Sequence, residues 1–207
     1  MRTLVIASQK GGVGKTTIAG HLAVMAESCG AGPVALIDTD PQGSLSSWWN
    51  ERQAETPAFA SVEISSLANH LMQLEKAGVK LAIIDTPPAV TETIRHVLTV
   101  ADLVLIPTRP SPHDLRAVGS TVELVEAAGK RMVFVINGAA PRAKITGEAA
   151  VALSQHGTVA PVTLYQRTNF AASMIDGRSA QEIDPASRSA SEVAELWNYV
   201  SAQLRKK

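Results

Sequence analysis

The stretch Lys10-Gly11-Gly12-Val13-Gly14-Lys15-Thr16-Thr17 follows an apolar run at the start of the chain. Glycine backbones can turn their N–H groups inward around a phosphate, because no side chain blocks the approach. The general phosphate-binding loop reads Gly-x-x-x-x-Gly-Lys-Ser/Thr, and Gly14-Lys15-Thr16 match its end. Gln9 stands where that pattern has its first glycine, so a strict pattern search misses the site. The stretch nevertheless predicts a nucleotide-binding loop between a strand and a helix.

The side chains of this loop predict how it holds a nucleotide. Lys15 supplies a cation to the β- and γ-phosphates, and the Thr16 hydroxyl can ligate Mg²⁺. The helix that begins near Thr16 adds its positive N-terminus. ATP or ADP and Mg²⁺ are therefore the expected cofactors. The alternative is a glycine-rich turn that only links strand to helix, but such a turn does not explain Lys-Thr in register after the last glycine.

Short aliphatic and β-branched runs recur along the chain and are predicted as strands. They are Leu4–Ala7, Val34–Ile37, Leu81–Ile84, Leu103–Ile106, Met132–Ile136 and Val159–Val162. Their continuous apolar character is typical of strands that are covered on both faces. Helix-like segments separate them, near 17–29, 44–54, 65–77, 91–100, 113–128, 144–156 and 188–205. This alternation predicts an α/β fold of the P-loop NTPase type, with a mostly parallel twisted sheet of about seven strands and helices on both faces.

Polar motifs follow three of the predicted strands, at Lys10–Thr17, Asp38–Ser44 and Asp85–Pro88. Ligands of open α/β sheets bind at the carboxyl ends of the strands, so we expect these motifs to converge. A length of 207 residues fits one core, and without a linker or repeat the prediction is a single P-loop ATPase domain over 1–207.

The order Lys-Gly-Gly-x-Gly-Lys-Thr-Thr is the deviant Walker A signature, and on it the chain resembles the ParA/MinD family of P-loop ATPases. The resemblance implies that Lys10, at the loop entrance, reaches across an ATP-sandwich homodimer to the phosphates bound by the partner. A cation delivered in this way can stabilise the charge on the transferring phosphoryl group. Lys10, Lys15 and the backbone from Gly11 through Gly12, Val13 and Gly14 to Thr16 and Thr17 are then the nucleotide-binding residues.

Two further stretches extend the resemblance. Ile37–Gly43 looks like the family's switch I, which implies that Asp40 orients or deprotonates the attacking water while Asp38 supports the loop and the metal shell. Ile83–Pro88 looks like Walker B and switch II, where Asp85 would hold Mg²⁺ through a water. The implied metal set is Thr16, Asp38, Asp40 and Asp85. As an alternative, each of these aspartates is a turn or N-cap residue.

Later segments resemble the family less specifically. Ile106–Leu115 resembles the segment that borders the dimer interface. Asn137 falls where family members often contact the adenine base, although an Asn before Gly138 is equally typical of a turn.

The ParA branch of the family positions plasmids, chromosomes or large protein assemblies, and its ATP dimers bind nucleoid DNA without sequence preference. The resemblance therefore implies non-specific DNA and a ParB-like or cargo-adaptor protein as partners. The stretch 165–179 resembles the family's late segment, so Arg167, Arg178 and Arg188 are candidate phosphate contacts, as are Arg205–Lys207. Carboxylates such as Asp176 and Glu182 interleave with these cations, which is equally typical of a solvated mixed-charge surface.

Composition limits the other possibilities. Lys plus Arg and Asp plus Glu both number 19, so net charge gives no general attraction to DNA or membranes. The one cysteine, Cys29, excludes an intrachain disulfide and a cysteine-bridged iron–sulfur cluster, and we expect it on a buried helix face. No apolar run reaches the ~20 residues of a membrane span. The expectation is a cytoplasmic, nucleoid-associated protein of the short ParA type, without an N-terminal helix-turn-helix.

Two rival functions remain open from the sequence. A MinD-like membrane switch would use the apolar stripe of the last helix, which is formed by Val193, Leu196, Trp197, Val200 and Leu204. Such a stripe more often packs on its own sheet, so membrane binding is not the expected outcome. A metabolic ATP-dependent enzyme on the same fold, similar to dethiobiotin synthetase, would need a substrate pocket that the sequence does not reveal.

Overall fold

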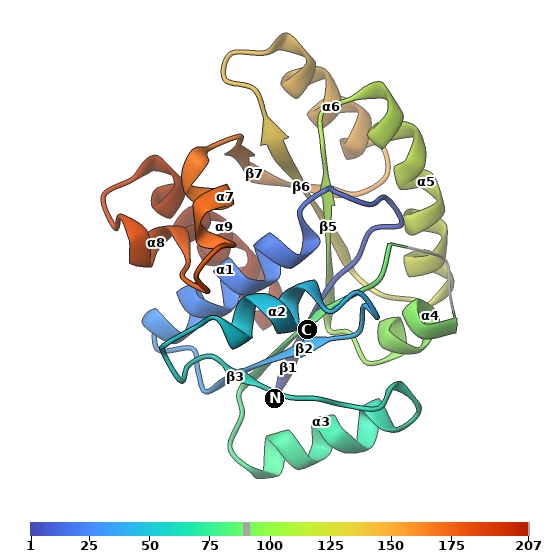
Figure 1. The fold of residues 1–207 in the computed structure, drawn as a ribbon. Helices are drawn as coiled ribbons and strands as arrows, with labels where there is room; N and C mark the ends of the chain where they lie inside the picture. Colours follow the sequence, from blue (N-terminus) through green and yellow to red (C-terminus); the bar gives the residue numbers. More distant parts are fainter. Residues whose placement is uncertain (89–91, 207) are drawn as a thin grey trace.

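The described part of the chain in the computed structural model, residues 1–88 and 92–206, forms a seven-stranded parallel sheet in the order β3-β2-β4-β1-β5-β6-β7 (Figure 1). Its strands are β1 (Arg2–Ile6), β2 (Val34–Asp38), β3 (Ala58–Phe59), β4 (Leu81–Asp85), β5 (Leu103–Thr108), β6 (Met132–Ala139) and β7 (Thr158–Tyr165). Every strand pair is parallel. The predicted α/β fold and strand number are confirmed.

Helices connect the strands and cover both faces of the sheet (Figure 1). They are α1 (Lys15–Ser28), α2 (Ser44–Asn50), α3 (Leu67–Lys76), α4 (Glu92–Thr99), α5 (Pro112–Ala127), α6 (Lys144–Ser154), α7 (Thr168–Ser173), α8 (Ala180–Ile183) and α9 (Arg188–Arg205), with a 3₁₀ turn at Ile64–Ser66. Alternate residues of β1 belong to different cores. Leu4 and Ile6 pack with α1, α2 and α9, whereas Val5 and Ala7 pack with the face that α3 to α6 cover. Burial on both faces explains the unbroken apolar runs.

Several strands extend beyond their predicted ends. β6 continues to Ala139, so Asn137 lies inside a strand and pairs with Leu164 of β7. β5 continues to Thr108 and includes Pro107, which has no N–H to donate. β1 pairs with β5 only as far as Ile6 and Leu105, so on that side no ladder bond needs the missing donor.

The prediction for Cys29 is wrong. Helix α1 ends at Ser28, and Cys29 follows it as an exposed residue whose Sγ lies 3.9 Å from Met25 Sδ. The apolar spacing that suggested a buried face holds for Ile18, Leu22 and Met25. It fails at Cys29 because the chain turns away there into Gly30, at φ +72°.

The apolar stripe of α9 faces the protein interior. Its members Val193, Leu196, Trp197, Val200 and Leu204 are all buried, and they pack in the same core as α1 and β7. The stripe is thus occupied in this structure and is not available to a membrane. None of the helices that the structure describes is long and apolar enough to cross a bilayer.

Candidate nucleotide site

The three polar motifs meet at the carboxyl ends of neighbouring strands β2, β4 and β1. The hydroxyl of Thr16, at the start of α1, donates to Asp85 Oδ2 at the end of β4, with 2.6 Å between the oxygens. Thr39, just after β2, donates its N–H and its hydroxyl to the backbone carbonyl of Asp85, at 3.0 and 2.6 Å. The phosphate-binding loop and the two aspartate loops therefore form one site.

The loop between β1 and α1 depends on glycine conformations. Gly12 and Gly14 have φ values of +74° and +92°, in the left-handed region that side chains disfavour. A Cβ on Gly14 would come within 2.2 Å of Asn137 Nδ2. Asn137 Nδ2 itself donates to the carbonyl of Val13 at 2.6 Å. Asn137 thus supports the end of the loop, and its contact with adenine stays a prediction.

Lys15 and Lys10 lie in opposite surroundings. Lys15 is 7% exposed, and burial lowers the pKa of its ammonium group, while Asp85 and Asp40 act in the raising direction. Lys10 is exposed at the loop entrance, where its backbone N–H donates to Ser8 Oγ at 3.3 Å. Lys15 is therefore enclosed by the loop and the two aspartate loops, whereas Lys10 is exposed to solvent.

Asp85 fits the prediction of a magnesium site. It is 1% exposed, and its Oδ1 has no hydrogen-bond partner among the residues described. Burial raises its pKa to about 7, against the lowering effects of the Thr16 hydrogen bond and of Lys15. An unpaired buried carboxylate oxygen is costly without a donor or a cation. Bound Mg²⁺ takes one or two protein oxygens and completes its shell with phosphate and water. Residues 1–88 and 92–206 contain no group of three or more His, Cys, Asp or Glu that could hold a metal ion.

Asp38 and Asp40 shape the loop between β2 and α2. Asp38 Oδ1 accepts the N–H of Asp40 at 3.0 Å, and Asp38 Oδ2 accepts the N–H and the hydroxyl of Ser46 at 2.9 and 3.0 Å. Asp40 Oδ1 accepts the N–H of Gln42 at 3.0 Å. Both carboxylates also act to raise the pKa of Asp85. Asp38 therefore links the nucleotide site to the first turn of α2.

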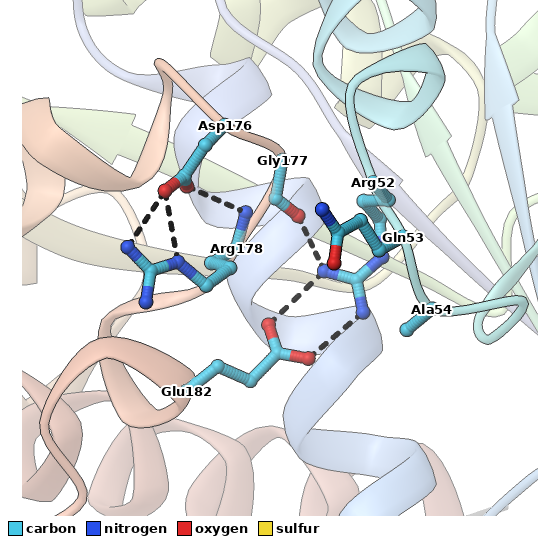
Figure 2. A pocket seen from close by; sticks show the side chains of 7 residues that line it. All are labelled: Arg52, Gln53, Ala54, Asp176, Gly177, Arg178 and Glu182. Carbon is cyan, nitrogen blue, oxygen red and sulfur yellow. Dashed lines mark hydrogen bonds and ion pairs between the residues drawn. The ribbon is translucent and has the colours of Figure 1, made fainter.

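Helix α2 and Arg52, which follows its C-terminus, contact the segment 173–182, a connection that sequence reasoning missed. The indole Nε1 of Trp48 donates to the carbonyls of Ser173 and Arg178, at 2.9 and 3.3 Å. The guanidinium group of Arg52 donates to Glu182 at 2.9 and 3.0 Å and to the carbonyl of Gly177 (Figure 2). A Cβ on Gly177 would lie 2.4 Å from the backbone N of Arg52. The only sequence signal was the Trp48-Trp49 pair, which does not reveal its partners.

His21 holds the same segment from α1, and sequence reasoning did not identify it either. Its Nδ1–H donates to the carbonyl of Thr17 at 2.7 Å, and its Nε2 accepts the N–H of Ala180 at 3.0 Å. Complete burial lowers the His21 pKa to about 4. A polar residue four positions after Thr17 on an apolar helix face was the available signal.

The three candidate DNA-contacting arginines do not form one patch. Arg167 pairs with the buried Glu192, at 2.8 Å from its Nε, and its guanidinium lies 5.5 Å from the Tyr165 ring centroid. Arg188 is exposed at the start of α9 and lines a cavity of about 470 Å³ together with Arg167. Arg178 lines another cavity, of about 450 Å³, where Asp176 pairs with it at 2.7 Å (Figure 2). Among the described residues, Arg188 makes no ion pair, so two of the three charges are already matched.

Comparison with known proteins gives consistent results. Residues 4–180 match the model of the CobQ/CobB/MinD/ParA nucleotide-binding domain. The maintenance of carboxysome distribution protein A of Halothiobacillus neapolitanus is 30% identical, over 96% of this chain and 95% of that protein. The Mg-ADP complex of the septum site-determining protein MinD from Pyrococcus horikoshii has a TM-score of 0.80 at 17% identity, over 96% of this chain and 95% of that one. An ATP complex of a Cyanothece McdA variant has a TM-score of 0.76 at 20% identity, over 100% and 97%.

Proposed function

Because this chain belongs to the CobQ/CobB/MinD/ParA family of nucleotide-binding domains, in which ParA and MinD are ATPases, we propose that it is a two-subunit ATP switch that positions a large cargo. Lys15, Thr16 and the loop backbone bind Mg-ATP, and Asp85 completes the metal shell through water. Asp40 orients the attacking water, and Lys10 reaches the nucleotide of the partner subunit. Bound Mg²⁺ would neutralise the charge that develops on the phosphates.

One observation carries the nucleotide part of this proposal. Buried Asp85 accepts from the Thr16 hydroxyl through Oδ2, while its Oδ1 has no partner among the described residues. The buried ammonium group of Lys15 is near enough for its charge to act on the pKa of Asp85. A buried cation and a buried carboxylate oxygen without a partner each need a ligand of opposite charge. Mg-nucleotide supplies both, because its phosphates pair with lysine and its metal pairs with the carboxylate.

The cargo is proposed from the relatives. The Halothiobacillus protein, named for carboxysome distribution, is similar over almost its whole length. We therefore take a large protein assembly such as a carboxysome as the first candidate, with nucleoid DNA as the track and an adaptor protein as the stimulator of hydrolysis. Arg188 is the leading DNA contact because its charge is unmatched within the described chain, whereas Arg167 and Arg178 must first leave their carboxylates.

DNA binding measured with ADP, ATP and a non-hydrolysable ATP analogue, across salt concentrations, tests this function. We expect binding with ATP and with the analogue that weakens steeply as salt rises, and little binding with ADP. Replacing Arg167, Arg178 and Arg188 together should flatten the salt slope. Lys76→Ala, which removes an exposed charge on α3, is the matched control. Nucleotide-independent binding, or an unchanged salt slope in the triple variant, would contradict the proposal.

Two further measurements distinguish the rival functions. ATP-dependent pelleting with anionic liposomes would favour a membrane switch, which the burial of the α9 stripe disfavours. Turnover that depends on a small-molecule substrate and ignores DNA would favour a metabolic enzyme.

A further inference from the structure

Gln9, the residue in place of the usual first glycine, makes two hydrogen bonds to helix α5. Its backbone N–H donates to Thr121 Oγ1 at 3.1 Å, and its side-chain Nε2 donates to the carbonyl of Ser120 at 2.9 Å. A glycine at this position could make only the first of these bonds. The glutamine therefore gives the loop entrance a second attachment to a helix that is distant in sequence.

The anchor on α5 is firmly held. Thr121 is 1% exposed, and Val118, Val122 and Val125 on the same helix are buried in the core with α4 and β5. The first turn of α5 is capped by Ser111, whose Oγ accepts the N–H of Asp114. The hydroxyl of Thr121 is a well-placed acceptor, because the core holds the helix backbone and threonine has only two favoured χ1 rotamers in a helix.

The far end of the loop is held as well, since Asn137 Nδ2 donates to the Val13 carbonyl at 2.6 Å. Lys10 comes directly after Gln9 and is exposed. A lysine side chain has many rotamers, so the direction in which it leaves the surface depends on how well its backbone is fixed. The attachments of Gln9 restrict that backbone from one side.

From this geometry we infer that Gln9 is a positioning residue, which ties the loop entrance to α5 through Thr121 and Ser120 and so directs Lys10 towards the partner subunit. The effect on Lys10 rests on the proposed two-subunit function. The attachment of Gln9 to α5 lies within this chain alone. Nucleotide binding by Lys15 and Thr16, at the other end of the loop, should not depend on it.

The pair Thr121→Val and Thr121→Ser tests the inference in the full chain. Valine has the shape of threonine but leaves the Gln9 N–H without its acceptor, whereas serine keeps the hydroxyl. Ser120→Ala is the matched control, because Gln9 uses only the backbone carbonyl of Ser120. Three quantities are measured: hydrogen exchange of the peptide that spans residues 8–14, the ATP affinity of the monomer, and the dissociation constant of the ATP-bound dimer.

For Thr121→Val we expect exchange at residues 8–14 to become about tenfold faster and the dimer to dissociate about tenfold more readily, as for the loss of one partly buried hydrogen bond. The ATP affinity of the monomer should stay within about twofold, because Thr121 and Ser120 are not among the residues proposed to bind ATP. Thr121→Ser and Ser120→Ala should behave like the parent protein. Gln9→Glu, at a surface position where folding is not at risk, should also weaken the dimer, because a carboxylate cannot donate to the Ser120 carbonyl.

Unchanged exchange in both Thr121→Val and Gln9→Glu would overturn the attachment. Faster exchange with an unaltered dimer would overturn the link to Lys10. If the parent protein forms no ATP-dependent dimer, or Lys10→Ala dimerises normally, the proposed two-subunit function fails instead, and exchange still decides the attachment.

Discussion

Lys15 and Asp85 show at the scale of single residues how the fold prepares the site. The ammonium group is buried with a lowered pKa, and the nearby carboxyl group is buried with a pKa of about 7. Desolvation is the largest cause in both cases, and it disfavours the charged forms. A ligand that brings both phosphate and cation restores favourable surroundings to both groups, which is why such sites bind the metal–nucleotide complex.

Lys15→Ala should abolish the stabilisation of the fold by Mg-ATP. A ligand present at 100 times its dissociation constant stabilises the folded state by about 2.7 kcal/mol, and the variant should lose nearly all of this. Thermal denaturation with and without Mg-ATP measures the effect, and Lys76→Ala serves as the control. If Mg-ATP raises the melting temperature of the variant as much as that of the parent protein, the phosphate-binding role is assigned to the wrong lysine.

His21 should make stability depend on pH. Its pKa is about 4 in the folded protein and about 6.5 in an unfolded chain, so between these values the unfolded state binds more protons. The free energy of unfolding should therefore fall as pH decreases through this range, by up to roughly 3 kcal/mol in total. Asp85 acts oppositely, since its raised pKa of about 7 makes the folded state bind more protons between about 3.8 and 7.

The variant His21→Asn keeps a donor for the Thr17 carbonyl but has no titrating side chain. Comparing it with the parent protein separates the contribution of His21 to the pH dependence of stability from that of Asp85. In chemical denaturation, the difference in unfolding free energy between parent and variant should shrink as pH falls from 7.5 towards 4.5. A constant difference would mean that His21 does not titrate as its burial requires.

At the scale of elements, α2 stands between the nucleotide loop and the segment 173–182. Asp38 binds the first turn of α2. Trp48 near the end of α2, and Arg52 just after it, bind the segment. The two ion pairs at this segment differ in burial. The side chain of Arg52, which pairs with Glu182, is 3% exposed, whereas that of Arg178, which pairs with Asp176, is 54% exposed. Buried guanidinium groups lose more when their partners are removed than exposed ones do.

Arg52→Ala should lower the free energy of unfolding by roughly 2 kcal/mol, because Glu182 and the carbonyls of Gly177 and Thr56 lose their donor. Arg178→Ala, with both partners of its ion pair exposed, is the matched control and should show no measurable change. Urea denaturation, analysed with a common m-value, measures the free energy of unfolding of both variants. A change for Arg52→Ala as small as that for Arg178→Ala would show that the buried contacts of Arg52 do not stabilise the fold.

The elements also show what the sequence could predict. The buried strands were predicted at their centres, because a strand covered on both faces must be apolar throughout. Strand β3 and helices α7 and α8 were missed. They are two, six and four residues long, too short for a periodic pattern, and contacts distant in sequence hold them, such as His21 with Ala180. The position of the glycine-rich loop between β1 and α1 could be predicted because its residue pattern is local, whereas the attachments of Gln9 and Asn137 depend on tertiary structure.

At the scale of the whole molecule, the strand order explains where the site lies. From β1 the chain builds β2 and β3 towards one edge of the sheet, and β4 then fills the place between β2 and β1. The next strand, β5, lies on the other side of β1, so β1 lies between β4 and β5. In open α/β sheets, ligands bind at the carboxyl edge where the strand order reverses in this way. The loop that follows β1 therefore contacts Asp85 from one side and α5 from the other. Local sequence patterns identify the strands but do not give this order.

The placement of tryptophan has an optical consequence. Two of the three indoles in the chain, Trp48 and Trp49, belong to α2, and the third, Trp197, is buried on α9. The Trp48 ring lies against Gly20 of α1, while Trp49 packs on Phe59 with 5.4 Å between ring centroids. A rearrangement of the loop that Asp38 ties to α2 would therefore reach two native fluorophores and leave the third as an internal reference. We therefore expect the tryptophan emission of the protein to change when Mg-ATP is added.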